Sequence, residues 1–263
     1  MILLDPINSV TSLQFYRKAA RHSLARLLLY LAYLSILVTM VYGFFIRRHV
    51  LPMLRSEFAW LGRALPTLTL DKGQLSGDVK EPLVLVEPHK LFTVVVDPAR
   101  IKPATAEDLE AKRAQVYVSR DALTILKQPG VVQSFDLGQM RRDAPVVLNA
   151  KFWDAAGKAA ARMTLLFVLF ALPLAFFLWK LVATAFYSVM ALALNSMLEA
   201  KLSYRELFNV ALYSQTFFTG LKLLFLFLPR PLPQPLLVAL TSTAVYIGLA
   251  IKTISSPAAP AAS

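Results

Sequence analysis

The sequence has 263 residues, of which 57% are hydrophobic and 17% are charged, and its mean hydropathy is +0.55. Water-soluble domains contain roughly 45–50% apolar and about 25% charged residues, so this composition excludes a purely soluble protein. The formal net charge is +12, but the basic residues are spread along the chain and form no single basic face, so we expect no nucleic-acid partner. The absence of cysteine excludes disulfides, a thiol nucleophile and thiolate metal sites.

Residues 1–26 form a basic segment that we expect to be a cytoplasmic amphipathic arm. Between residues 13 and 24, apolar side chains share one side of a helical wheel, and polar ones such as Arg17, Lys18 and Arg21 share the other. This pattern is typical of a helix lying among lipid headgroups. The alternative is a cytoplasmic helix that continues into the first membrane span.

Residues 27–46 are predicted to be the first transmembrane helix. Their length matches the ~20 apolar residues that cross a bilayer. Arg47 and Arg48 follow where a signal peptide would have small residues and a cleavage site, so we expect a retained anchor.

Residues 47–162 mix polar and apolar residues at the spacing of strands, which predicts a compact, β-rich extracytoplasmic domain. The clearest element is a hairpin across residues 68–76, in which Gly73 supplies the positive φ angle of a tight turn. Thr105 is a candidate cap for a short helix. Further strands are predicted at 83–86, 92–96, 115–118, 123–126 and 131–137.

Residues 163–251 are predicted to form a transmembrane bundle with three more spans. We expect the first, at about 163–194, to belong to one long helix that is bent at Pro173 and ends in water near 195–199; two shorter spans are the alternative. The others are 207–228 and 235–251, separated by a proline-rich connector, and 252–263 is expected to be a disordered tail. Small residues such as Ala244 and Gly248 predict close helix packing.

The distribution of basic residues in short loops predicts the orientation. With four spans, the arm, the loop with Lys201 and Arg205, and the tail with Lys252 share one side and carry seven basic residues, against Arg230 alone on the other. The positive-inside rule therefore places both termini in the cytoplasm. At the first span alone, the basic residues that follow the span balance those in the arm, so this span shows no charge bias.

The pattern of titratable residues does not predict an enzyme. His22, His49 and His89 stand in separate contexts without the spacing of a zinc site. Asp71 and Asp97 fall at a hairpin and a strand end, where turn hydrogen bonding is the favoured interpretation over a catalytic pair. We therefore expect no catalytic residue, no metal and no cofactor.

Polar residues within the predicted spans are the candidate site residues: Lys180, Asn195, Gln215 and Lys222. Ionisable groups in hydrocarbon are costly and tend to face protein or water. Gln215 and Lys222 lie two turns apart on one helix face and could line a small polar cavity. The favoured alternative is that Lys222 reaches toward headgroups while Gln215 makes an interhelical hydrogen bond.

Several short stretches resemble a family of bacterial polytopic membrane proteins, domain of unknown function 1189. They are Ser-Leu-Gln-Phe-Tyr before the first span, residues 70–75 in the hairpin, 95–97, 116–118 with 123–125, and 203–208 before a later span. The family includes MalA-like proteins encoded with maltodextrin genes and is grouped with Yip-type membrane proteins. The resemblance implies the architecture and supplies no catalytic residues. The Arg-rich character and the Pro/Ala tail of this chain depart from it, so no maltodextrin role is implied.

Together these features predict an α+β membrane protein with about four transmembrane helices and a mostly β extracytoplasmic domain inserted between the first two. We expect a multi-pass, non-enzymatic protein of the bacterial cytoplasmic (inner) membrane, acting as an accessory, scaffold or sensor subunit of a complex. Its expected partners are the lipid bilayer and other membrane or periplasmic proteins, with the ligand unknown. The alternative is a small transport or lipid-handling subunit.

Overall fold

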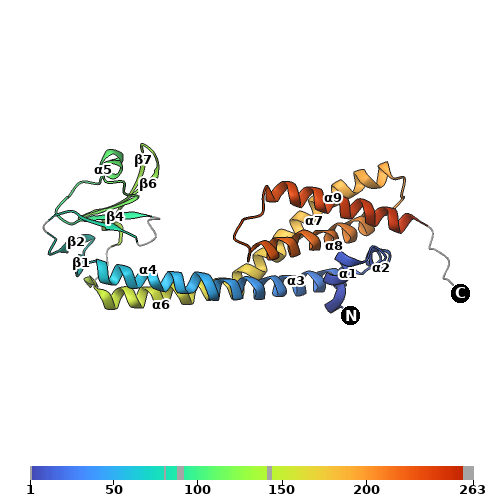
Figure 1. Cartoon of the computed structure of the whole chain (residues 1–263), viewed down its shortest axis with the longest axis horizontal. Coiled ribbons are helices and arrows are strands. Elements are labelled where there is room, and N and C mark those ends of the chain that lie inside the picture. Colours follow the sequence, from blue (N-terminus) through green and yellow to red (C-terminus); the bar gives the residue numbers. More distant parts are fainter. Residues whose placement is uncertain (1, 80, 88–91, 141–143, 257–263) are drawn as a thin grey trace. The chain divides into compact units, whose positions relative to one another are not determined.

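The computed structural model describes residues 2–79, 81–87, 92–140 and 144–256. The chain divides into two compact units. The helical unit comprises Met1–Arg48 and Thr164–Ser263, and the sheet unit comprises His49–Met163. Figure 1 shows both, with all the strands in the second. The fold class is therefore α+β, with a sheet domain and membrane-length helices.

Three helical runs among the described residues are long and apolar enough to cross a membrane, namely Leu24–Ala64, Ala150–Met197 and Pro235–Ser255. The first comprises α3 (Leu24–Phe45), a π turn (Ile46–Val50) and α4 (Leu51–Ala64); the second comprises α6 (Ala150–Leu166), a π turn (Phe167–Ala171) and α7 (Leu172–Met197); the third is α9 (Pro235–Ser255). A single helical run thus covers residues 163–197, and the alternative of two shorter spans there is wrong.

Each π turn immediately precedes a proline-containing helical turn. Pro52 follows the first π turn and Pro173 follows the second. Proline has no N–H to donate, and its ring clashes with the carbonyl four residues earlier. That carbonyl belongs to Arg48 in the first run and to Leu169 in the second, both within the π turns. The irregularity expected at Pro173 therefore takes the form of a locally widened helix.

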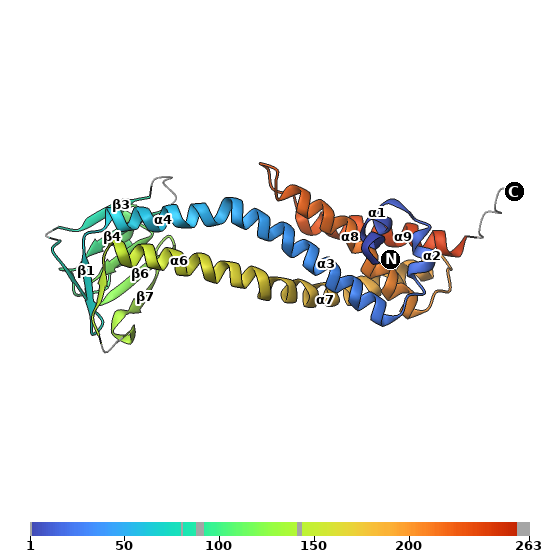
Figure 2. The same ribbon diagram turned by 90° about the horizontal axis from the view of Figure 1, so that it is seen from below.

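The sheet unit differs from the prediction at both of its ends, where it contains helices. α4 and the larger part of α6 occupy residues that were expected to have strand character. α4 is amphipathic, with charged side chains such as Arg55 and Arg63, and α6 is rich in alanine, the best helix former. Figure 2 shows these two helices running alongside each other.

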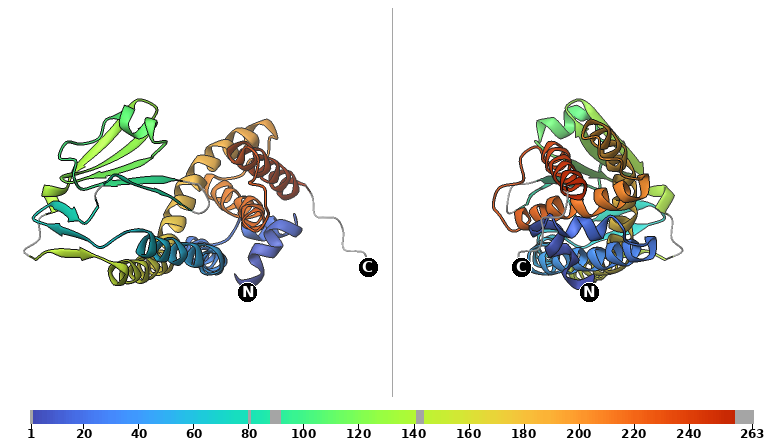
Figure 3. Two further views of the ribbon diagram at one scale, coloured as in Figure 1. Left: turned by 60° about the vertical axis from the view of Figure 1, so that its left-hand side comes forward. Right: turned by 90° about the vertical axis from the view of Figure 1, so that its right-hand side faces the viewer.

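α8 (Tyr204–Phe225) is the most enclosed helix of the helical unit. It contacts α7, α9 and α3, together with the short helices α1 (Asp5–Thr11) and α2 (Phe15–Ala19). Figure 3 shows α8 in orange between red α9 and the blue amino-terminal helices. Residues 207–228 were expected to form a span, yet α8 is not among the three membrane-length apolar helices. A helix that faces protein on most sides needs less apolar surface than one that faces lipid.

The amino-terminal arm packs on the helical unit. Tyr16, Ala19 and Ala20 are buried in the same core cluster as residues of α8 and α9. The side-chain amide of Asn209 on α8 donates to the carbonyls of Ala19 and Ala20 at 3.3 and 2.8 Å. Ser23 then caps α3, so α2 and α3 are separate helices. The apolar face of the arm thus contacts protein, and the alternative of one continuous helix is wrong.

The sheet unit contains one five-stranded and one three-stranded sheet. The larger has the order β3-β4-β5-β6-β7, with β4 and β5 parallel and the other pairs antiparallel; the smaller is antiparallel with the order β2-β1-β8. The strands are β1 (Leu68–Asp71), β2 (Gln74–Gly77), β3 (Leu83–Val86), β4 (Thr93–Asp97), β5 (Val116–Ser119), β6 (Ala122–Gln128), β7 (Val131–Asp136) and β8 (Val146–Leu148).

Local sequence signals predicted several of these elements. Gly73 has φ of +84° in the β1–β2 hairpin, where an added Cβ would clash with the backbone of Gly138. α5 (Ala106–Ala111) begins with a capping box in which Thr105 and Asp108 bond each other's backbone N–H. The five other predicted strands are present within one or two residues at each end, whereas β8 was not predicted.

The five-stranded sheet is covered on both faces. Val95 and Tyr117 pack with Leu109 of α5 on one face. Val96, the next residue of β4, packs with Leu68 and other residues of the three-stranded sheet on the opposite face. This alternation follows from the two-residue period of a strand.

The expectation that Gly248 permits close helix packing is wrong. A Cβ added there would meet nothing within 4 Å. α9 instead buries a different face, formed by Ala239, Thr243, Ile247, Ala250 and Ile251.

Candidate functional site

α7 carries a buried row of polar side chains at four-residue spacing. Lys180, Thr184 and Ser188 lie on the same helix face and are 8%, 0% and 0% exposed. Each hydroxyl donates to its own helix, Thr184 to the Lys180 carbonyl and Ser188 to the Thr184 carbonyl, both at 2.6 Å. The Lys180 ammonium remains free to contact groups on other helices.

Gln215 of α8 faces this polar row. Its Nε2 atom donates to Thr184 Oγ1 at 2.9 Å, and its Oε1 atom accepts from Lys180 Nζ at 3.5 Å. The ammonium of Lys180 also lies 5.6 Å from the centroid of the Phe176 ring, within cation–π range. The amide of Gln215 therefore bridges two polar groups of α7, which fixes its orientation.

Lys180, Gln215 and Lys222 line one pocket of about 270 Å³ within the helical unit. The remaining lining residues are Trp179, Ala183, Tyr187, Phe218, Pro235, Leu236, Ala239 and Thr243. The structure thus brings three of the four sequence-predicted site residues together. Sequence reasoning missed Thr184, although the four-residue spacing of Lys180, Thr184 and Ser188 is a signal that could have revealed it.

Asn195 lies outside this group of pocket-lining residues. Its amide closes the connection between α7 and α8, because Oδ1 accepts from Leu202 N at 3.1 Å and Nδ2 donates to the Leu202 carbonyl at 3.4 Å. Its observed contacts are those of a loop-closing residue.

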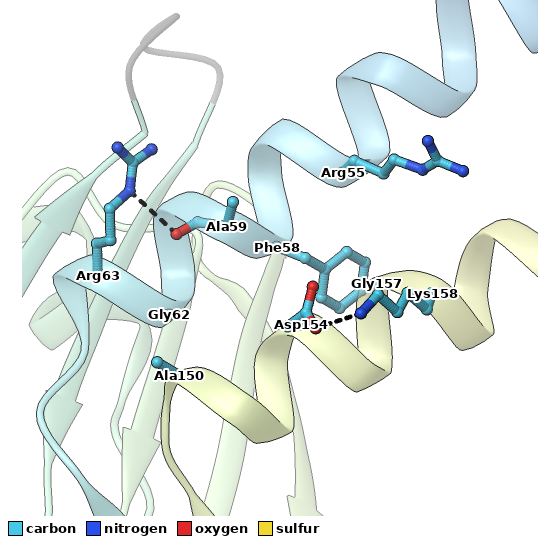
Figure 4. A pocket seen from close by; sticks show the side chains of 9 residues that line it. All are labelled: Arg55, Phe58, Ala59, Gly62, Arg63, Ala150, Asp154, Gly157 and Lys158. Carbon is cyan, nitrogen blue, oxygen red and sulfur yellow. Dashed lines mark hydrogen bonds and ion pairs between the residues drawn. The ribbon is translucent and has the colours of Figure 1, made fainter.

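A second pocket, of about 580 Å³, lies along α4 and α6 in the sheet unit, as shown in Figure 4. Phe58 of α4 points at Gly157 of α6, where an added Cβ would lie 2.9 Å from the Phe58 Cβ. Arg55 and Lys158 also line this pocket. Lys158 pairs with Asp154 at 2.7 Å. The glycine allows the two helices to approach closely.

The carboxylates singled out in the sequence have separate partners. Asp97 accepts a 2.8 Å hydrogen bond from the hydroxyl of buried Tyr117, while Asp71 pairs with Gln74 in the hairpin register. Arg100 stacks near the Tyr117 ring and donates to Asp108 at 2.6 Å. The Arg100 guanidinium, followed by the Thr105 backbone, holds the pKa of Asp108 well below its usual value. One ion pair, one tyrosine–carboxylate hydrogen bond and one cation–π contact thus link these side chains in the sheet unit.

The histidines differ in environment. The Nδ1 atom of His22 lies 2.9 Å from the hydroxyl of Tyr213, while His89 lies outside the described residues. Within the described ranges, no group of three or more His, Cys, Asp or Glu side chains could hold a metal ion.

Comparison with known proteins gives one match. The family model described as "Protein of unknown function (DUF1189)" matches residues 6–251. The chain belongs to this family. Searches of curated proteins and of solved structures give no match. The DUF1189 match covers both units and all three membrane-length helices almost completely.

Proposed function

We propose that this DUF1189 chain is a non-enzymatic accessory or scaffold subunit of the bacterial cytoplasmic membrane, which binds a protein partner through its sheet unit. The observation that carries the proposal is the edge of the five-stranded sheet at β7. Among the described strands, β7 pairs with β6 alone. An unpaired edge presents backbone N–H and C=O groups to which an extended segment of another protein can add as a further strand.

The side chains of β7 support a docking role for this edge. Val131 is 51% exposed and Phe135 is 39% exposed. Exposed apolar and aromatic side chains on an edge strand favour association, and native proteins usually protect such edges with charge, proline or a bulge. Here the edge strand has one acidic residue, Asp136, at its end, and the register of its pairing with β6 shifts between Leu126 and Gln128. A partner strand would cover these side chains.

Site-specific crosslinking tests this proposal. A photoreactive amino acid at Phe135 is expected to capture a discrete partner in living cells, whereas the same probe at exposed Glu107 on α5 is expected to capture none. Charge substitution at the edge, Val131→Lys, should abolish the Phe135 adduct without unfolding the sheet. An equal yield at both probe positions, or no adduct at Phe135, would contradict the proposal.

We further propose that α8 crosses the membrane with the three apolar helices, which gives four spans. Short connections join its two ends to α7 and α9, and it packs against both. In the proposed arrangement, a helix that packs along two membrane-length helices extends through the same depth as they do. Four spans place both termini in the cytoplasm by the positive-inside rule and the sheet unit on the outer side.

Cysteine labelling tests this topology directly, because the native chain has no cysteine. A membrane-impermeant thiol reagent added to intact spheroplasts should label Glu107→Cys in the sheet unit. It should label Arg21→Cys in the arm only after permeabilisation. The reverse pattern would overturn the orientation.

The second candidate function is a small transport or lipid-handling subunit, and the shared pocket of Lys180, Gln215 and Lys222 favours it. A deletion strain should show an altered membrane lipid composition that the wild-type gene restores. Lys222→Leu, expressed at the normal level, should fail to restore it. Full restoration by that variant would exclude a path through the pocket.

A further inference from the structure

We propose that the pocket of Lys180, Gln215 and Lys222 binds the acidic headgroup, carboxylate or phosphate, of a membrane amphiphile. This inference rests on the second candidate function and names its ligand class. It is independent of the partner-docking role of the sheet unit, because all the pocket residues belong to the helical unit.

The charge of the pocket is uncompensated. Two lysines line it, and its other lining residues include no carboxylate. The ion pairs observed among the described residues are Arg26–Asp5, Arg100–Asp108 and Lys158–Asp154, so the described part of the chain places no acid within pairing distance of Lys180. A buried ammonium needs an opposite charge or several hydrogen bonds. An acidic ligand would supply both.

The hydrogen-bonding capacity of Lys180 matches such a ligand. An ammonium has three N–H donors, and the observed hydrogen bond to Gln215 uses one of them at the long distance of 3.5 Å. The Gln215 amide is held in place by its bond to Thr184, so its orientation need not change on binding. The remaining donors can bond the oxygens of a carboxylate or phosphate, which form short charge-assisted hydrogen bonds.

The walls of the pocket favour an amphiphile over a free inorganic anion. Trp179 and Leu236 line it and are 68% and 73% exposed, on two helices that are apolar enough to span a membrane. A cavity of about 270 Å³ is smaller than the ~300–1,000 Å³ typical of sites that enclose a whole drug-sized ligand. A headgroup fits within it, while the alkyl chain lies outside along the apolar helix surfaces.

Ligand-dependent stability of the full-length protein tests this inference. The protein is reconstituted in nanodiscs of zwitterionic phosphatidylcholine and heated with oleate, phosphatidylglycerol, oleyl alcohol or inorganic phosphate. We expect oleate or phosphatidylglycerol to raise Tm, with the stronger of the two identifying the headgroup. Oleyl alcohol, which has the same chain as oleate without the acid, should have no effect, and inorganic phosphate should act at least about tenfold more weakly than the amphiphiles.

Three lysine variants locate the effect. Lys222→Met and Lys180→Met should each weaken the apparent affinity by about tenfold or more, because each removes a charge from the pocket. Lys252→Met alters an exposed lysine of α9 that does not line the pocket. The apparent affinity of this variant for the acidic amphiphile should equal that of the wild type. Lys222 is exposed, so its replacement tests the inference even if Lys180→Met fails to fold.

Equal Tm shifts from oleate and oleyl alcohol would overturn the inference, as would equal ligand-induced Tm shifts in Lys222→Met and Lys252→Met. A response to inorganic phosphate as strong as that to the amphiphiles would also overturn it. The ligand-dependent Tm measurement and the crosslinking at Phe135 are independent. A negative Tm result would not contradict the docking role of the sheet unit, and loss of the Phe135 adduct would not contradict ligand binding in the pocket.

Discussion

The Nζ atom of Lys180 lies 3.5 Å from the Oε1 atom of Gln215, and this contact joins the buried polar face of α7 to α8. The same amide binds Thr184 through its nitrogen at 2.9 Å. A lysine, an amide and a hydroxyl from two helices thus form one connected group inside the helical unit.

This group predicts a dependence between Lys180 and Gln215. Gln215→Leu should destabilise the protein by about 1–2 kcal/mol, because it removes an interhelical hydrogen bond and leaves a buried ammonium with fewer partners. The same change in a Lys180→Met background should cost less, since no buried charge then remains. The free energy of unfolding is measured in mixed micelles for the wild type, the two single variants and the double variant. Strictly additive changes in this free energy would contradict the prediction.

The contact of Gly157 with Phe58 predicts an unusual response to alanine. In an exposed helix, Gly→Ala stabilises by roughly 1 kcal/mol. At Gly157 the new Cβ would lie 2.9 Å from the Phe58 Cβ, so Gly157→Ala should lower Tm. Gly248→Ala in α9 is the matched control, because its Cβ would meet nothing within 4 Å, and it should raise Tm or leave it unchanged. A higher Tm in Gly157→Ala would show that the helices do not approach as described.

Asn209 is predicted to attach the amino-terminal arm. Its Nδ2 atom donates to the carbonyls of Ala19, Ala20 and His22. Asn209→Asp places a carboxylate against these carbonyl oxygens, which should release the arm and speed tryptic cleavage at Arg17 or Lys18 by about tenfold or more. Gln14→Glu makes the same chemical change at an exposed position and should leave the cleavage rate unchanged. Equal rates in the two variants would count against this role.

His22 predicts a pH dependence of stability. Burial, followed by the charge of Arg26, lowers the pKa of His22 below its ordinary value of 6.5, with Asp5 opposing the shift. The unfolded chain therefore takes up a proton at higher pH than the folded chain, and stability is lost as the pH falls below about 6.5. The fall in Tm between pH 7.5 and 5.5 should be smaller in His22→Gln than in the wild type. Equal falls would exclude His22 as the source.

Local sequence signals predicted the parts of the fold in which one residue decides the backbone. Gly73 specified the β1–β2 hairpin because a tight turn requires a positive φ, and Thr105 specified the start of α5 because its hydroxyl satisfies a free N–H. Uninterrupted apolar character likewise predicted one long helix through Pro173.

The structure differs from the sequence-based prediction for two separate reasons. α4 is amphipathic and α6 is rich in alanine, so neither has the continuous apolar character of a membrane span. Their residues were therefore assigned to the same β-rich segment as the strands between them. The arm was expected among lipid headgroups, and its position relative to a bilayer stays a prediction, because an apolar helix face predicts burial without identifying what covers it. Here α8 and α9 cover Tyr16 and Ala19.

The sequence by itself determined that this protein has helices long and apolar enough to cross a membrane, that a β-rich segment interrupts these helices, and which residues are polar within them. Only the tertiary structure decided that Lys180, Gln215 and Lys222 share one pocket while Asn195 closes a loop. The reason is geometric: spacing along one helix fixes which side chains share a face. The rotation and depth at which two helices pack decide which faces meet, and those depend on the whole set of packed side chains.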